Sequence, residues 1–190
     1  MKSASPRANK LSGKKVLHIL TGSIAAYKAG DLIKLLRENG AEVTCVMTES
    51  AAKFITPLTL RAISGRPVYG EFFDPHTPYD VLHTSLADQC DMILAAPASA
   101  NFIARLAAGL ADDLASCIVL AARKPVFIAP AMNDQMYEHP LTQRNIKTLR
   151  EIGCRFIEPI EGDLVCGKTA IGHISEPHTV LAELTAFLKA

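Results

Sequence analysis

The chain has 190 residues, a length that predicts one compact domain with little room for a second catalytic module. Its 20 Lys and Arg residues nearly balance its 19 Asp and Glu residues, giving a formal net charge of +1. This balance does not favour nucleic acid or an anionic membrane as a partner, and we expect neither. Hydrophobic residues make up 49% and charged residues 21%, which argues against disorder over most of the chain.

The N-terminal segment is polar and basic, and it lacks the apolar stretch of a signal peptide. No apolar run approaches the roughly 18 residues that a membrane-spanning helix needs. We therefore expect a cytoplasmic protein with a flexible leader over residues 1–13 and a single domain over residues 14–190. The five cysteines show no C-x-x-C spacing and the histidines are scattered, so we expect reduced thiols and no metal site.

Short apolar runs alternate with segments of helical periodicity along the chain. The predicted central strands cover residues 16–20, 43–47, 92–96, 126–129 and 155–157. The predicted helices cover residues 24–39, 51–55, 57–63, an Ala-rich stretch to about residue 122 that Gly109 divides, 141–152 and 176–188. This alternation predicts an α/β domain with a three-layer, doubly wound parallel sheet, similar to Rossmann-like and flavodoxin-like folds.

Two segments follow neither periodicity. Residues 70–79 mix Gly, Asp, Pro, His and aromatic residues, which indicates a loop of the kind that often covers a site. Residues 160–175 are typical of an irregular hairpin. Ligands of doubly wound sheets bind at the carboxyl ends of the strands, so the loops at 22–23, 48–50, 97–101 and 130–133 should converge on one rim.

The turn formed by Gly22 and Ser23 lies between a predicted strand and a predicted helix. Its backbone N–H groups, hydroxyl and helix end can hold a phosphate, although the same pair also suits an ordinary strand-to-helix turn. The sequence is not G-x-G-x-x-G, which favours a mononucleotide over a dinucleotide. Glu49 either binds a ribose or is an exposed first-turn residue, and the second interpretation is favoured.

Four further residues carry two interpretations each. Ser99 and Asn101 can bond a heterocycle or a phosphate, or can cap a helix. His83 is a proton acceptor at neutral pH or a structural histidine. Asn133 binds a substrate carboxylate or caps the following helix. Cys166 lies in a Gly-rich polar stretch, which indicates an accessible thiol.

Five segments occur in one order along the chain: Gly-Ser-Ile-Ala-Ala-Tyr-Lys at 22–28, His83 before Leu86 and Asp91, Pro-Ala-Ser-Ala-Asn at 97–101, Pro-Ala-Met-Asn at 130–133, and Cys166-Gly167. Together they resemble the homo-oligomeric flavin-containing cysteine decarboxylase family. Within it, the sequence from about Lys14 onward is most similar to the phosphopantothenoylcysteine decarboxylases of coenzyme A biosynthesis.

The resemblance implies a bound FMN and a set of residues around it. The implied FMN contacts are Gly22, Ser23, Ile24, Thr48, Glu49, Ser50, Ser99, Ala100, Asn101, Phe102 and Ala131. It also implies that His83 accepts a proton, Asn133 binds the substrate carboxylate and Cys166 donates a proton. A substrate clamp formed by Asp163, Leu164 and Val165 is implied as well, although Ala170 and His173 depart from the family pattern there.

The implied reaction is FMN-dependent decarboxylation of 4'-phosphopantothenoylcysteine to 4'-phosphopantetheine. The implied assembly is a homotrimer or a dodecamer, with a separate phosphopantothenoylcysteine synthetase in the pathway. Three alternatives stay open: an oxidative decarboxylase of C-terminal peptide cysteine, a non-catalytic regulatory flavoprotein subunit, and a flavin prenyltransferase. Cys166 favours phosphopantothenoylcysteine decarboxylation over the decarboxylation of peptide cysteine.

Overall fold

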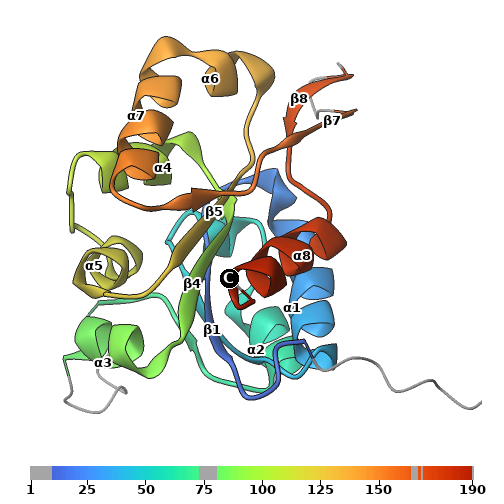
Figure 1. Cartoon of the computed structure of the whole chain (residues 1–190), viewed down its shortest axis with the longest axis vertical. Coiled ribbons are helices and arrows are strands. Elements are labelled where there is room, and N and C mark those ends of the chain that lie inside the picture. The colour runs from blue at the N-terminus through green and yellow to red at the C-terminus, as the bar shows by residue number, and fades with distance from the viewer. Residues whose placement is uncertain (1–9, 73–80, 164–166, 168, 190) are drawn as a thin grey trace, which may run out of the picture.

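A six-stranded parallel sheet forms the centre of the molecule, which a computed structural model describes over residues 10–72, 81–163, 167 and 169–189 (Figure 1). The strand order is β3-β2-β1-β4-β5-β6. The strands are β1 (Lys15–Leu20), β2 (Glu42–Met47), β3 (Val68–Tyr69), β4 (Met92–Ala98), β5 (Val126–Pro130) and β6 (Arg155–Phe156). The chain order reverses between β1 and β4, so the predicted doubly wound topology is confirmed.

Helices cover both faces of the sheet. One face packs against α1 (Ala29–Glu38), α2 (Pro57–Ser64) and α8 (Pro177–Phe187). The other packs against α3 (Leu82–Gln89), α4 (Ala100–Ala107), α5 (Leu114–Ala121) and α7 (Pro140–Glu151). In Figure 1 these two groups lie on opposite sides of the strands. The three layers therefore bury two separate apolar clusters, one on each face of the sheet.

Short polar side chains begin several helices where the sequence suggests caps. Thr56 accepts a hydrogen bond from the Thr59 N–H before α2, whose first residue is a proline. Asp113 and Ser116 form a capping box at the start of α5. This second cap explains why the predicted Ala-rich helix is two helices, because the chain leaves α4 after Ala107 and restarts at Leu114.

Some short elements escape the sequence patterns. The predicted helix from residue 24 begins as the 3-10 helix η1 (Ile24–Lys28) before α1, and a second 3-10 helix is η2 (Ala51–Lys53). The five-residue α6 (Asp134–Glu138) is too short to show a period, and so is β3. Leu11 is fully buried and its N–H donates to the Asn39 carbonyl, so packed structure reaches back beyond the expected boundary at Lys14.

A separate two-stranded antiparallel sheet follows β6. It consists of β7 (Ile160–Asp163) and β8 (Thr169–His173), and we call these two strands the hairpin. The hairpin confirms the irregular segment predicted there. Figure 1 shows it projecting beside α6, beyond the carboxyl end of β5. No helix in the described part of the chain combines the length and apolar character needed to cross a lipid bilayer.

Candidate functional site

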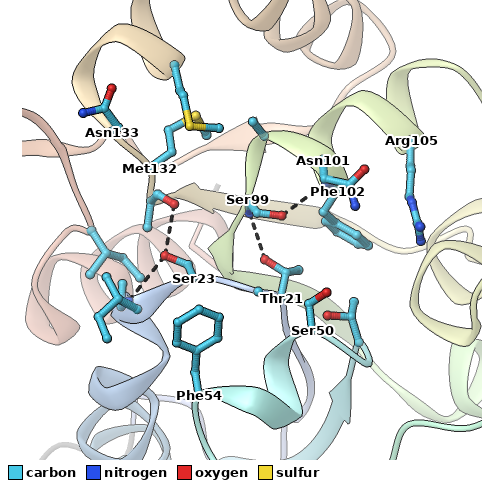
Figure 2. Close-up of a pocket in the computed structure, with 18 of the residues that line it drawn as sticks. Thr21, Ser23, Ser50, Phe54, Ser99, Asn101, Phe102, Arg105, Met132 and Asn133 are labelled. Carbon is cyan, nitrogen blue, oxygen red and sulfur yellow. Dashed lines mark hydrogen bonds between the residues drawn. The ribbon is translucent and has the colours of Figure 1, made fainter. Parts of the chain in front are cut away.

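A cavity of about 810 Å³ opens at the carboxyl ends of the central strands (Figure 2). The segments that follow β1, β2, β4 and β5 all contribute to its wall, as the sheet topology predicts. Its size is that of a site for a cofactor or a drug-sized molecule. The eleven residues suggested as flavin contacts all line it: Gly22, Ser23, Ile24, Thr48, Glu49, Ser50, Ser99, Ala100, Asn101, Phe102 and Ala131.

The turn after β1 packs directly against the turn after β2. A Cβ atom placed on Gly22 would lie 2.5 Å from the Cβ atom of Ser50, a separation that real structures do not tolerate. Only glycine allows these two backbones to approach so closely. Glu49 lies beside them, but its side chain is 93% exposed and its carboxylate lies 3.7 Å from the Lys53 ammonium. Glu49 therefore matches the exposed residue that the sequence favoured.

Two side chains, His18 in β1 and Thr21 just after β1, hold the end of β4, where the pairing of β4 with β5 becomes irregular. The Thr21 hydroxyl donates to the Pro97 carbonyl at 2.8 Å and accepts from the Ser99 N–H at 2.8 Å. The His18 Nε2–H donates to the Ala96 carbonyl at 2.6 Å, next to the cis Ala96-Pro97 peptide. Burial lowers the pKa of His18 to about 4, so the ring is neutral at pH 7.

The amino end of α4 faces the cavity. The Ser99 hydroxyl caps the helix by accepting from the Phe102 N–H at 3.3 Å. Helix geometry leaves the first N–H groups, those of Ala100 and Asn101, without intrahelical acceptors. Together with the helix dipole, these groups favour an anion at this end of the cavity. We call this part of the wall, formed by residues 21–22, 50 and 99–102, the α4 end.

Arg105 lies at the α4 end and was not singled out from the sequence (Figure 2). Its Nη1 lies 3.3 Å from an Asp112 oxygen and 2.7 Å from an Asp113 oxygen. The two carboxylates offset the guanidinium charge and join α4 to the start of α5. Arg105 lies four residues after Asn101 in the same helix, so the two side chains share one helix face. This spacing could have identified Arg105 from the sequence.

The wall opposite the α4 end comes from β5 and the hairpin. Ser23 donates to the Ala131 carbonyl at 3.2 Å, and the Met132 N–H donates to the Gly172 carbonyl at 3.1 Å. A Cβ atom on Gly172 would lie 2.2 Å from the Met132 carbonyl oxygen, and Gly172 has a φ of +129°. Glycine is therefore required there. We call this wall, formed by residues 131–133 and 172–174, the hairpin end.

The structure confirms the helix-capping interpretation of Asn133, and it places this residue on the cavity wall. Its Oδ1 accepts from the Gln135 N–H at 3.0 Å, which makes Asn133 the N-cap of α6. The same residue lines the cavity at the hairpin end (Figure 2). The capping bond fixes the orientation of the carboxamide, so a neutral polar group stands at a defined place on the wall.

His83 does not line the cavity of its own chain. It lies on α3, half-buried, with its ring centroid 5.6 Å from that of Phe72. Figure 1 places α3 and the hairpin at opposite ends of the view. Within a single chain, His83 and Asn133 therefore do not line the same cavity. The reason is that α3 packs beside α5, away from the carboxyl ends of β4 and β5.

The remaining predicted residues belong to the hairpin. Asp163 is the last residue of β7. Leu164, Val165 and Cys166 lie outside the described residues. Of the other thiols, burial raises the pKa of Cys45 to about 12 and that of Cys90 to about 11, so these two are not reactive nucleophiles.

Comparison with known proteins identifies the relatives of this chain. The sequence profile of the Flavoprotein family matches residues 4–189. The coenzyme A biosynthesis bifunctional protein CoaBC of Haemophilus influenzae is 48% identical over 178 residues, which are 94% of this chain and 44% of that protein. The chain thus spans less than half the length of the curated relatives that it matches.

Two solved structures share the fold over nearly their whole length. A PPC decarboxylase mutant complexed with pantothenoylaminoethenethiol is 34% identical, with a TM-score of 0.82, covering 93% of this chain and 99% of that one. The FMN-dependent cysteine decarboxylase SpaF is 31% identical, with a TM-score of 0.83, covering 95% and 99%.

Proposed function

This chain belongs to the Flavoprotein family, and from that membership we propose that it binds FMN noncovalently and decarboxylates 4'-phosphopantothenoylcysteine to 4'-phosphopantetheine. The proposal is supported by the 48% identity to a coenzyme A biosynthesis protein and by the likeness to a PPC decarboxylase along nearly all of that chain. The observation that carries it is one cavity that has the amino end of helix α4 at one end and a neutral carboxamide, Asn133, at its hairpin end.

The cavity residues fit FMN. The turns at Gly22 and Ser50, which approach closely, and the start of α4 together form one concave part of the wall, which we call the cradle. The first N–H groups of α4 face this cradle. This cradle suits one phosphate, whereas the sequence lacks the glycine pattern of a pyrophosphate site. We therefore propose that Ser99, Ala100 and Asn101 hold the phosphate and that Ser23, Ile24 and Ala131 contact the ring system.

Loss of carbon dioxide from a cysteine amide needs an electron sink that the substrate lacks. Bound FMN would supply two-electron oxidation of the substrate CH₂–SH group to C=S, which accepts the electrons released when the carboxylate leaves. His83 would accept the proton removed in this oxidation. Asn133 would orient the carboxylate through neutral hydrogen bonds, which avoid the ground-state stabilisation that a strong ion pair would give.

Cys166 would protonate the enethiolate formed by carbon dioxide loss. Together with the hydride that bound, reduced FMN would supply, this proton gives a saturated thiol and leaves no net oxidation. Its assignment rests on the Cys166-Gly167 sequence pattern. A decarboxylase of peptide cysteine that stops at the enethiol does not need this proton donor. The pattern therefore favours phosphopantothenoylcysteine over a peptide as the substrate.

We further propose that a second copy of the chain supplies His83 to each cavity, in a homotrimer or in a dodecamer built from four trimers. The support is that His83 does not line the cavity of its own chain, although the reaction needs a proton acceptor beside the substrate. Exposed apolar side chains at the cavity mouth fit this proposal. They are Ile24, Tyr27, Phe54 and Met136.

The decisive experiment offers the FMN-loaded protein two substrates, phosphopantothenoylcysteine and a peptide ending in cysteine. Mass spectrometry should find phosphopantetheine, 44 Da lighter than its precursor, since one carbon dioxide is lost overall. A product 46 Da lighter from the peptide alone, the mass change of oxidative decarboxylation, would establish the alternative peptide decarboxylase. Failure to turn over either substrate would leave the regulatory flavoprotein and the flavin prenyltransferase.

Shared sites can be tested by mixing inactive subunits. His83→Asn and Asn133→Ala proteins should each bind FMN and each lose on the order of 100-fold or more in turnover. Reassembled together, they should recover part of the activity, because some cavities then carry both native residues. A mixture as inactive as its components would show that His83 acts within its own chain or not at all.

The Cys166 assignment has its own assay. Cys166→Ser should still release carbon dioxide but should accumulate the enethiol product, whereas His83→Asn should release none. Measuring both gas release and product mass separates the two roles. Normal phosphopantetheine formation by Cys166→Ser would remove Cys166 from the mechanism.

A further inference from the structure

Lys28, His173 and Glu176 form a cluster beside the hairpin end of the cavity. The Lys28 ammonium donates to Nε2 of His173 at 2.8 Å and to a Glu176 carboxylate oxygen at 2.8 Å. The Lys28 side chain is only 15% exposed, whereas that of Glu176 is 55% exposed. The bond to Lys28 lowers the pKa of Glu176, so the carboxylate stays ionised at a lower pH than an ordinary glutamate does.

The cluster closes a ring of contacts around the hairpin end. Ser23 begins η1 and bonds to Ala131, and Met132, the next residue, bonds to Gly172. His173 follows Gly172 and accepts from Lys28, which ends η1. Three contacts therefore tie η1, the end of β5 and the hairpin together. The Lys28 contact is the one that attaches the hairpin to η1.

The hydrogen bond requires one state of His173. An ammonium group can only donate, so Nε2 must be unprotonated and the neutral ring carries its proton on Nδ1. Protonating the ring would abolish the acceptor and would set two positive charges at the distance of a hydrogen bond. Lys28 of η1 donates to the His173 ring, and Glu176 before α8 interacts with it electrostatically. Helix α6 also packs against β8 and carries the carboxylates of Asp134 and Glu138. From β7 the ring meets Gly162, which has no titratable group.

We propose that Lys28 is a positioning residue, which acts through neutral His173 to hold the hairpin against Met132 and Asn133, so that substrate binding weakens when His173 takes up a proton. This inference rests on the proposed function for the identity of the substrate. Asn133 and His173 line the same end of the cavity, so a displaced hairpin would open the wall where the carboxylate is proposed to bind. Lys28 and His173 are not part of the α4 end, so that end should keep its ligand.

The test compares steady-state kinetics of FMN-loaded variants between pH 5.5 and pH 8.5. For the native protein, KM should rise as the pH falls, by about tenfold, the size of one lost charge-assisted hydrogen bond. His173→Gln keeps a carboxamide oxygen that can accept from Lys28 but does not titrate, so its KM should vary much less with pH. Lys28→Met should have a raised KM at every pH, with kcat and FMN content little changed.

Lys34→Met on α1 is the matched control, because Lys34 is an exposed lysine whose carboxylate partner, Asp31, is 4.0 Å away. Its KM should follow the native curve. A His173→Gln protein with the native pH dependence, or a Lys28→Met protein with the native KM, would overturn the proposal.

A second measurement does not depend on turnover. Hydrogen exchange of the amides of residues 169–173, in FMN-loaded protein without substrate, should be about tenfold faster in Lys28→Met than in the native protein at the same pH. Peptides from β1 and β4 should exchange alike in both. If exchange changes as expected but no cysteine substrate is decarboxylated, the positioning role stands and the proposed function fails. Unchanged exchange in Lys28→Met would refute the positioning role whatever the substrate.

Discussion

The two ends of the cavity are built in different ways. At the α4 end, buried groups of the central sheet position the wall, since Thr21 bonds both Pro97 and Ser99 from within the core. At the hairpin end, a two-stranded sheet outside the core is attached through Met132 and Lys28. Stability concentrates where contacts are buried and dense. The α4 end can therefore stay rigid while the hairpin end responds to conditions.

One glycine marks each end. Gly22 lets two strand-end turns touch at the α4 end, and Gly172 lets the hairpin touch the Met132 carbonyl. A methyl group added at either position disrupts one end and leaves the other in place. The two alanine variants therefore test whether the α4 end and the hairpin end are independent.

Gly172→Ala should have the largest effect. The added Cβ atom meets a backbone oxygen at 2.2 Å, and a φ of +129° disfavours alanine, so the hairpin must leave its position. Steric overlap and backbone strain together cost about 4 kcal/mol. We expect KM to rise by about 100-fold or more, with FMN still bound. Flavin absorbance and substrate titration measure the two quantities, and loss of FMN from Gly172→Ala would show that the two ends are coupled.

Gly22→Ala should have the reciprocal effect. Its Cβ atom would lie 2.5 Å from the Cβ atom of Ser50, and separating the two turns costs about 3 kcal/mol. FMN affinity should fall by about 100-fold, since the cradle opens. Equilibrium dialysis against FMN gives the dissociation constant. Gly109→Ala is the control, because its Cβ atom would meet nothing within 4 Å and Gly109 lies outside the cavity wall. An unchanged FMN affinity in Gly22→Ala would show that the turns at Gly22 and Ser50 do not form part of the FMN site.

Acid should weaken the α4 end through His18. The folded-state pKa of about 4 lies below the unfolded value of about 6.5, so protons bind preferentially to the unfolded chain. The stabilisation is complete above pH 6.5 and is lost as the pH falls toward 4, by about 3 kcal/mol in total. Denaturant unfolding at fixed protein concentration measures this loss.

His18→Gln isolates that contribution, because glutamine can still donate to the Ala96 carbonyl but does not titrate. Its free energy of unfolding should change by about 3 kcal/mol less than that of the native protein between pH 7 and pH 4. Parallel pH curves for the two proteins would show that His18 is not the group responsible.

Much of the fold could be predicted because its signals are local. The apolar runs of β1, β2, β4 and β5 are buried strands, and they bring loops distant in sequence to one edge. The shortest elements could not be predicted. β3 has two residues and α6 has five, so neither shows a period, and their positions depend on tertiary contacts.

The candidate site was predictable only in part, for a related reason. Residues of strand-end loops, such as Ser99 and Asn133, were found because topology places them. His173 appeared only as a departure from a family pattern, since its partner Lys28 is 145 residues away in the sequence. His83 was grouped with Asn133 from family order alone. A sequence does not state whether two residues meet within one chain or between two copies.

The smallest expected effect comes from Ser23, which bonds to Thr21 of the α4 end and to Ala131 of the hairpin end. Its hydroxyl accepts from the Ala25 N–H at 3.3 Å and donates to the Ala131 carbonyl at 3.2 Å, so it caps η1 and joins β1 to β5. Ser23→Ala removes both bonds, each worth about 1 kcal/mol or less at these lengths. Since η1 continues to Lys28, a loosened η1 should raise the FMN dissociation constant and KM together, each by about three- to fivefold.

Ser99→Ala is the matched control for Ser23→Ala. Ser99 also caps a helix with its hydroxyl, but its contacts lie at the α4 end alone. Its loss should weaken FMN binding by a similar factor and leave KM at saturating FMN unchanged. Measuring both constants for both variants therefore asks whether η1 transmits changes between the ends. If Ser23→Ala alters only FMN binding, as Ser99→Ala should, the ends are independent and the ring through Lys28 does not extend to the cofactor cradle.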